Sequence, residues 1–395
     1  MDYPLLQNYY IRVYSRISIR NIIWTIISSN ITTLIGLGNL FVNLKGCNMD
    51  SISEKHIENG KTQFLMVLIL GIITVFLSLF AMGQGSSSNL DMMSTINIIL
   101  GLEAATELQS DIIWKLRFPR ILMAIIGGAA LAVAGSLMQG CLGNPLVSPL
   151  TLGVASGAAL GAAFAIVLGV SVLPYSNLAI VANAFFFSLI VVAIIIQLGS
   201  LRSISAESYI LVGIAITFIS GAVVSTMQYF ATDAQLSQLA HWSFGSLSRP
   251  DLIQVLAISI AVLGLMPTAM KWSWDLNALS IGGDEFAIST GVNPAETRRN
   301  MLILSAFMTS VVIAFTGLIG FVGLAAPHMS RLIIGNDYRK LIPCSAIFGA
   351  FLMVFADTLG RTLFAPIVIP VGIMLSIIGG PFFMYLLLAN RGGKK

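Results

Sequence analysis

Charge is what this sequence has least of. Only 10% of its 395 residues are Asp, Glu, Lys or Arg, against about 25% in a typical soluble domain. These 21 basic and 17 acidic residues are too few to cover the surface of a soluble fold of this length, and 56% of the chain is hydrophobic. The apolar surplus must face lipid, which excludes a cytosolic enzyme, a nucleic-acid-binding protein and a disordered chain.

Cysteine is scarce and scattered. Cys47, Cys141 and Cys344 form no CxxC motif, and the three histidines lie far apart, so neither a disulfide framework nor a metal site is indicated. The GxxxxGK[ST] motif of nucleotide-binding loops is missing as well. We therefore expect no metal, no cofactor, no catalytic residues and no ATP binding by this chain alone.

Residues 1–63 differ from the rest of the chain. They hold six of the 21 basic residues and a polar stretch, Ser51–Lys61. Within them, Asn21–Asn43 is uncharged and long enough to span a bilayer, but its asparagines and hydroxyls favour an interfacial or loosely packed helix. We predict an N-terminal cytoplasmic or interfacial extension over residues 1–63, with Met49 as an alternative start of the chain.

After this extension, apolar segments of about 17–23 residues recur, each long enough to cross a hydrocarbon core of about 30 Å. The fold class predicted is an all-α polytopic membrane protein. Its ten transmembrane helices are expected at residues 64–83, 118–139, 150–170, 177–198, 208–230, 251–270, 300–316, 319–335, 342–362 and 368–390.

Basic residues orient these spans. With both termini inside, 16 Lys and Arg residues fall in cytoplasmic segments and 5 in outer segments. Cytoplasmic loops of membrane proteins carry an excess of Lys and Arg. We therefore predict a multi-pass protein of the cell membrane with both termini in the cytoplasm.

Three of the five outer basic residues are candidates for function. Arg117 and Arg120 open the second span from outside, where the positive-inside bias and the helix dipole both disfavour them. Asp357 and Arg361 lie four residues apart near the outer end of the ninth span, the better order for a helical ion pair. The arginines are candidates for docking an acidic partner. The alternatives are arginines that reach lipid phosphates and a self-neutralised structural pair.

The longest inner loop between spans is Leu276–Arg299. Its sequence predicts a short helix, a Gly291-Val292-Asn293-Pro294 turn and a second helix that starts at Pro294. The mixed charges and small residues favour a contact surface for a cytoplasmic partner, and a solvated loop is the alternative.

The fifth span carries small and polar residues at steps of three and four, which places them along one side of a helix. Such a stripe is typical of a permeation path, or of close helix packing in lipid. Its members are Gly213, Thr217, Ser220, Gly221, Ser225 and Gln228.

Several motifs then occur in order, and together they resemble the permease family of type II ABC importers for iron–siderophores, haem and cobalamin. The resemblance covers residues 64–393, and residues 1–48 have no counterpart in the family pattern. The motifs are RFPR at 117–120, GNPLVSPLTLG at 143–153, HWSFGSL at 241–247, GFVGLAAPHMSRLIIGNDYRKLIP at 320–343, ADTLGR at 356–361 and IPVGIMLSIIGGPFF at 369–383.

The resemblance implies ten helices, with spans 2–5 and 7–10 related as an inverted repeat. It also implies a second permease subunit, either a homodimer or a heterodimer, two cytoplasmic ATPase subunits and an extracytoplasmic substrate-binding protein. Membrane lipid is expected as a further partner, and nucleic acid is not. ATP hydrolysis would belong to the separate ATPase subunits.

Residue roles follow from the same resemblance. Arg117, Arg120 and Arg361 match the arginines that receive the binding protein, and the fifth span matches the helix that lines the path. Tyr338 departs from the family, which commonly has histidine there. The loop that docks on the ATPase is matched by Leu276, Gly282, Asp284, Glu285, Gly291, Val292 and Pro294.

The expected function is ATP-driven import of a metal chelate, with a ferric siderophore as the first candidate and haem or cobalamin next. The alternative is an ion-coupled secondary transporter, which would need carboxylates near the membrane midplane. Few lie inside the predicted spans. An intramembrane enzyme would need a cluster of catalytic side chains at membrane depth, and the sequence contains none.

Overall fold

The computed structural model describes residues 49–84, 90, 92–173, 176–201 and 206–389. Contacts divide the chain into two compact units, Met1–Phe64 and Leu65–Lys395. The predicted interfacial helix Asn21–Asn43 lies outside the described residues. Everything below concerns the second unit unless stated otherwise.

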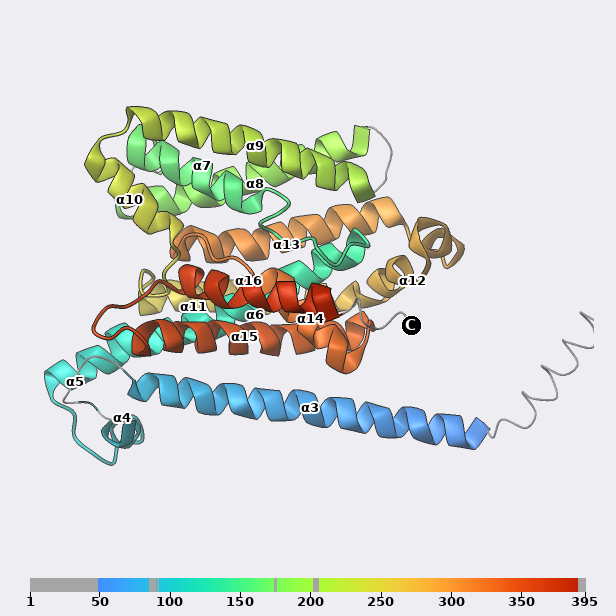
Figure 1. The fold of residues 1–395 in the computed structure, drawn as a ribbon, viewed down its shortest axis with the longest axis horizontal. Coiled ribbons are helices and arrows are strands. Elements are labelled where there is room, and N and C mark those ends of the chain that lie inside the picture. Colours follow the sequence, from blue (N-terminus) through green and yellow to red (C-terminus); the bar gives the residue numbers. More distant parts are fainter. Residues whose placement is uncertain (1–48, 85–89, 91, 174–175, 202–205, 390–395) are drawn as a thin grey trace, which may run out of the picture. The chain divides into compact units, whose positions relative to one another are not determined.

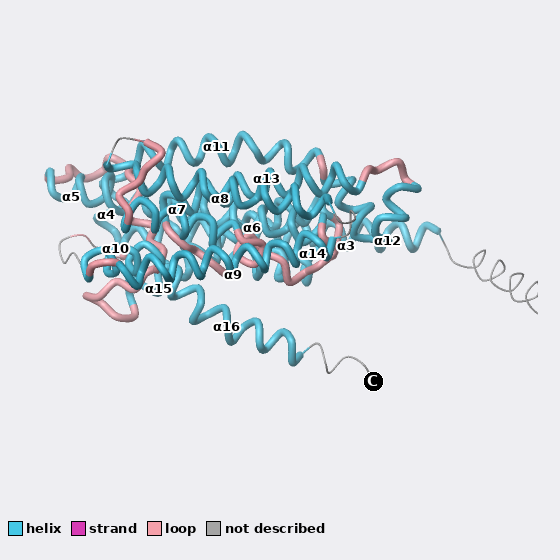
Figure 2. Tube along the Cα trace, turned by 90° about the horizontal axis from the view of Figure 1, so that it is seen from above, coloured by secondary structure: helices cyan, strands magenta, loops and turns pink. Residues whose placement is uncertain are grey.

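Every regular element in the described residues is a helix, and loops gather where helices end (Figure 2). The elements are α3 (Met49–Gly83), α4 (Met92–Ile99), α5 (Glu107–Asp111), the π-helical η1 (Ile112–Arg117), α6 (Phe118–Cys141), α7 (Val154–Val167), α8 (Ser176–Leu201), α9 (Ala206–Phe230), α10 (Asp233–Ser243), α11 (Leu252–Lys271), α12 (Ser273–Ser289), α13 (Pro294–Thr316), α14 (Val322–Ile334), α15 (Tyr338–Thr362) and α16 (Val371–Ala389).

The long helices run back and forth between two ends of the bundle, one marked by α10 and the other by α12 (Figure 1). We call these the α10 end and the α12 end. Each of the ten predicted spans falls on one apolar helix. Among the described residues, seven helices are long and apolar enough to cross a membrane, and α7, α14 and part of α16 are shorter apolar helices. The all-α polytopic class is confirmed, whereas the number of crossings stays a prediction.

Several boundaries differ from the predicted ones for local reasons. α7 begins at Val154 rather than at residue 150, because Gly153 before it has a left-handed backbone (φ 87°) that helices do not continue. α13 begins at Pro294 rather than at residue 300, because Asn293 caps it. α3 begins at Met49, so the polar stretch Ser51–Lys61 is helical.

The two halves of the bundle use equivalent helix pairs. α6 packs on α15 as α13 packs on α8, and α7 packs on α8 as α14 packs on α15. α7 and α14 are the short members of their halves, and each follows a residue at positive φ, Gly153 or Phe321. This correspondence supports the predicted inverted repeat.

Glycines bring α6 into backbone contact with two neighbours. A Cβ at Gly128 would lie 2.3 Å from the carbonyl oxygen of Gly349 in α15, and one at Gly135 would lie 1.7 Å from that of Gly323 in α14. Small residues permit such close helix crossings in membrane proteins. α6 is therefore the central helix against which α14 and α15 are fixed.

Gly135→Ala tests this packing. The added methyl group meets backbone rather than a flexible side chain, so α6 and α14 must separate, at a cost of about 3 kcal/mol. We expect a clearly lower melting temperature in detergent. Gly264→Ala in α11 is the control, because a Cβ there has no neighbour within 4 Å. Equal melting temperatures for the two variants would contradict the close crossing.

Candidate functional site

The arginine motif lies inside a longer helix rather than at a helix start. α5, η1 and α6 form one segment of 35 residues, Glu107–Cys141. Its first turn is capped by Thr106, whose hydroxyl accepts a hydrogen bond from the backbone N–H of Gln109. The prediction that Arg117 and Arg120 lie at the positive end of a helix dipole is therefore wrong.

A π-helical turn precedes the motif. Pro119 has no N–H to donate to the preceding turn, and its ring crowds that turn. The turn is wide, with the N–H of Phe118 bonded to the carbonyl oxygen of Ile113 five residues back. Such turns are frequent at functional sites. Here the widened turn ends at Arg117, whose side chain is buried in the bundle.

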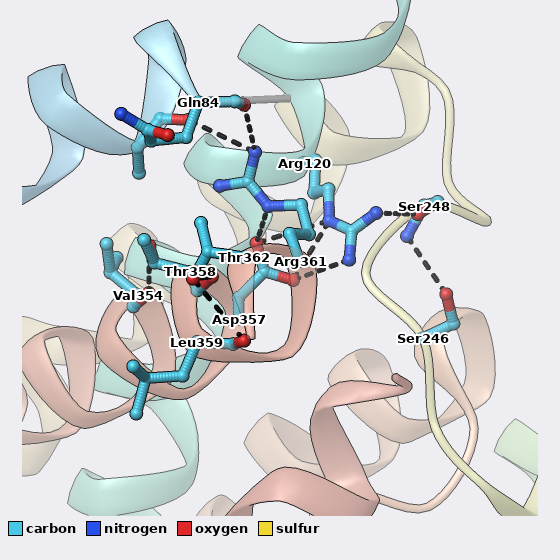
Figure 3. Close-up of polar contacts among 11 residues, drawn as sticks. Gln84, Arg120, Ser246, Ser248, Val354, Asp357, Thr358, Leu359, Arg361 and Thr362 are labelled. Carbon is cyan, nitrogen blue, oxygen red and sulfur yellow. Dashed lines mark hydrogen bonds and ion pairs between the residues drawn. The ribbon is translucent and has the colours of Figure 1, made fainter. Parts of the chain in front are cut away.

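Asp357 joins α6 to α15 at the α10 end (Figure 3). Its Oδ1 accepts from Nε of Arg120 at 2.9 Å, and its Oδ2 accepts from Nε of Arg361 at 3.0 Å. Nη1 of Arg120 donates to the hydroxyl of Ser248 at 2.8 Å. One carboxylate, on a side chain that is 2% exposed, thus bridges guanidinium groups from two helices.

Two of the arginines also bind the last carbonyl groups of α3. Nη1 of Arg361 donates to the carbonyl oxygens of Ala81 and Gln84 at 3.1 and 2.9 Å. Nη1 of Arg117 donates to that of Met82 at 2.7 Å. These carbonyls lack donors within the helix and form the negative end of its dipole. We call Arg117, Arg120, Asp357 and Arg361 the arginine cluster.

The arginine cluster contains both predicted features in one place. The i,i+4 ion pair Asp357–Arg361 is confirmed. The pairing of Asp357 with Arg120 was missed, since the two residues lie far apart in sequence and only the contact of α6 with α15 joins them. Arg117 is 6% exposed, and the side chains of Arg120 and Arg361 are 14% and 7% exposed. This burial leaves little guanidinium surface for lipid phosphates.

The predicted partner loop has the predicted local structure. α12 bends at Gly283 (φ 68°) and is followed by a turn with Gly291 at φ 84°. The side chain of Asn293 then accepts from the first N–H groups of α13, which starts at Pro294. The short helix, the turn and the helix start at Pro294 are confirmed.

A groove of about 390 Å³ runs along the turn of this loop, beside Asp284, Gly291 and Pro294. The residues proposed from sequence for this loop fall into three groups by burial. Leu276 and Pro294 are buried, Asp284 and Val292 are half-buried, and Gly282, Glu285 and Gly291 are exposed.

Arg298 anchors this loop to the bundle, which the sequence did not indicate. Its Nε donates to the carbonyl oxygen of Cys141, the last residue of α6, at 2.9 Å. Its Nη1 donates to Oδ2 of Asp284 in α12 at 2.8 Å, and the residue is only 5% exposed. Arg298 thus ties the second half of α12 to the end of the central helix.

The stripe predicted on the fifth span divides along α9. Gly213 and Ser220 are buried, and Thr217 is half-buried, with its hydroxyl bonded to the carbonyl oxygen of Gly213. A Cβ at Gly213 would meet Leu152 at 3.2 Å, so this half packs within the bundle. Gly221, Ser225 and Gln228 form the other half and are exposed.

The fold defines a multi-pass membrane protein with the α12 loop at one end of the bundle and the arginine cluster at the other. The pattern of the FecCD transport family matches residues 23–389. The chain belongs to this family. The match begins upstream of residue 48, so the prediction that residues 1–48 have no counterpart does not hold for residues 23–48.

Named relatives agree with the family. An ABC transporter permease protein of Methanocaldococcus jannaschii is 41% identical over 346 residues, 85% of this chain and 98% of the relative. The hemin transport system permease protein HmuU of Yersinia pestis is 38% identical over 337 residues, covering 84% and 98%. The Fe(3+)-citrate import system permease protein YfmE of Bacillus subtilis is 34% identical over 340 residues, covering 85% and 98%.

A solved structure agrees as well. It is described as an inward-facing conformation of a metal-chelate type ABC transporter. It superposes with a TM-score of 0.71 at 30% identity and covers 82% of this chain and 99% of that chain. The chain is therefore the transmembrane permease subunit of an ABC importer, a multi-pass protein of the cell membrane. It is not an enzyme, because in this family ATP hydrolysis resides in separate subunits.

Proposed function

We propose that this permease moves a metal chelate into the cell, with a ferric siderophore as the first candidate and haem or cobalamin next. The observation that carries the proposal is the similarity, over 98% of their length, to relatives named for hemin and for Fe(3+)-citrate. A relative named for vitamin B12 import, from Klebsiella pneumoniae, is 34% identical over 280 residues.

The proposed assembly has a second permease subunit, identical or paralogous, two ATPase subunits and a substrate-binding protein. In it the α12 end faces the cytoplasm, as the basic residues near it favour, and both termini lie on that side. The ATPase subunits would contact the loop from Leu276 to Pro294. The exposed half of the α9 stripe, Gly221, Ser225 and Gln228, would line the path beside the second permease.

Uptake by cells tests the substrate. A strain that lacks this gene, with and without a plasmid copy, is given radiolabelled ferric siderophore, haem or cobalamin. We expect one class of chelate to be lost in the deletion strain and recovered with the plasmid. Unchanged uptake of all three classes would contradict a chelate importer.

The arginine cluster is proposed to attract acidic residues of the binding protein. It holds three guanidinium groups against one carboxylate, a formal charge of +2. Nη2 of Arg361 is buried and has no acceptor among the described residues. Because the side chains are largely buried, we attribute docking to this net charge rather than to projecting side chains.

Arg120→Gln and Arg120→Lys separate charge from geometry. Both lose the two-pronged bond to Asp357, but only the glutamine variant loses the charge. We expect Arg120→Gln to slow binding-protein association several-fold at low salt and to weaken its salt dependence, with Arg120→Lys near the wild type. The measurement is surface plasmon resonance on nanodiscs at several salt concentrations. Equal association rates for the two variants would reject docking through the charge of the cluster.

A further inference from the structure

The side chain of Asn277 connects α12 to the start of α15. Its Nδ2 donates to Oδ1 of Asp337 at 2.9 Å, and its Oδ1 accepts from the backbone N–H of Tyr338 at 2.8 Å. Both ends of one amide group are therefore used to hold a segment 60 residues further along the chain. None of the motifs in the sequence indicated this pair.

Asp337 is itself fixed in place. Its carboxylate caps α15 by accepting from the N–H of Arg339, and it forms an ion pair with the guanidinium of that residue at 2.6 Å. The hydrogen bonds from Arg339 lower the pKa of Asp337 to about 2, so the carboxylate stays ionised at neutral pH. The same guanidinium lies over the ring of Trp274 in α12, 4.2 Å from its centroid.

α15 links this contact to the far end of the bundle. Asp337 precedes its first residue, and Asp357 lies 20 residues further on, about 30 Å along a helix. Between them Gly349 touches the backbone of Gly128 in α6, which holds α15 against the central helix. The contact with α12 and the arginine cluster are therefore two ends of the same helix.

We propose that Asn277 is a positioning residue that locks the first half of α12 to α15, so that a displacement of α12 moves α15 and reaches Asp357 in the arginine cluster. This proposal rests on the proposed function, since the displacing force is that of the ATPase. The second half of α12, beyond the bend at Gly283, is held separately by Arg298. Each half of α12 thus has its own connection to the bundle.

Three variants test the contact of Asn277 with the start of α15. They are Asn277→Ala, Asn277→Asp and the double variant Asn277→Asp/Asp337→Asn. The alanine removes both bonds, and the aspartate places two carboxylates side by side. The double variant restores a bond in the opposite direction, because the carboxylate at 277 accepts both from the amide at 337 and from the N–H of Tyr338. Asn336→Ala, an exposed asparagine next to Asp337, is the matched control.

The readouts are ATP hydrolysis and uptake of radiolabelled ferric siderophore by proteoliposomes that contain the complete transporter. We expect Asn277→Ala to lose at least fivefold in binding-protein-stimulated hydrolysis and in uptake. Asn277→Asp should lose more, the double variant should recover at least half of the wild-type value, and Asn336→Ala should match the wild type. Wild-type coupling in Asn277→Ala would overturn the proposal, as would a double variant no better than Asn277→Asp.

Hydrogen exchange of the permease alone separates this proposal from the proposed function. The N–H of Tyr338 should exchange at least fivefold faster in Asn277→Ala than in the wild type or in Asn336→Ala, whatever the transporter carries. Unchanged exchange would reject the connection itself. Absence of ATP-driven uptake of ferric siderophore, haem or cobalamin by the wild type, with exchange altered as expected, would reject the proposed function and leave the connection established.

Discussion

Asp357→Asn is expected to unfold the α10 end of the bundle and to abolish transport. The variant keeps an acceptor oxygen but loses the negative charge that pairs with both Arg120 and Arg361. Removing one partner of a buried ion pair costs about 3–5 kcal/mol, because the remaining charge stays buried without compensation. Arg361 also binds carbonyl groups at the end of α3, so loss of its position frees the end of that helix.

The loss of stability is measured as the melting temperature in detergent, with fluorescence size-exclusion chromatography as the detection method. Asp111→Asn is the matched control, because Asp111 pairs with Lys115 at the surface, where the two side chains are 57% and 71% exposed, and exposed pairs contribute little. We expect a large drop in melting temperature for Asp357→Asn and none for Asp111→Asn. Equal melting temperatures would show that the arginine cluster does not stabilise the fold.

Gly291→Val is expected to uncouple ATP hydrolysis from uptake while the membrane helices remain folded. Gly291 has φ 84°, a backbone region that costs an L-residue about 1–2 kcal/mol, and a branched side chain fits it worst. A Cβ there meets nothing within 4 Å, so the effect comes from the backbone and not from a clash. The turn must change shape, which moves α12 relative to Pro294.

The matched control is Gly101→Val, in the turn after α4. Gly101 has φ 71° and also has open space around its Cα, so the strain is similar but lies away from α12. Binding-protein-stimulated hydrolysis and chelate uptake are measured side by side in liposomes. Gly291→Val should lose uptake and the stimulation of hydrolysis by the binding protein, so that the hydrolysis that remains is uncoupled from uptake. Gly101→Val should keep both. If Gly291→Val also kept both, the loop would not transmit the ATPase movement, and Arg331–Lys340 would be the next candidate.

Local features of the fold were predictable because they depend on residues close in sequence. The lengths of the apolar segments predicted the ten helices, and the Asn293-Pro294 pair predicted the start of α13. The i,i+4 spacing of Asp357 and Arg361 predicted their ion pair. Each of these needs only a helix period or a cap.

Contacts between distant segments were not predictable in this way. The bonds of Arg120 to Asp357 and of Arg298 to Cys141 join residues 237 and 157 positions apart. They arise only where α6 packs against α15 and α13. The sequence marks the arginines as unusual, but the apolar segment that follows them suggests a helix start at that point. The helix in fact begins at the capping box of Thr106, eleven residues before Arg117.

The ATP dependence of uptake distinguishes an ABC importer from an ion-coupled transporter. The permease is reconstituted in liposomes with the proposed ATPase and binding protein. Uptake of radiolabelled ferric siderophore, haem and cobalamin is followed with ATP, with a non-hydrolysable analogue, or with an imposed proton or sodium gradient. We expect accumulation of one chelate with ATP alone. Accumulation driven by an ion gradient without ATP would contradict it and identify an ion-coupled transporter instead.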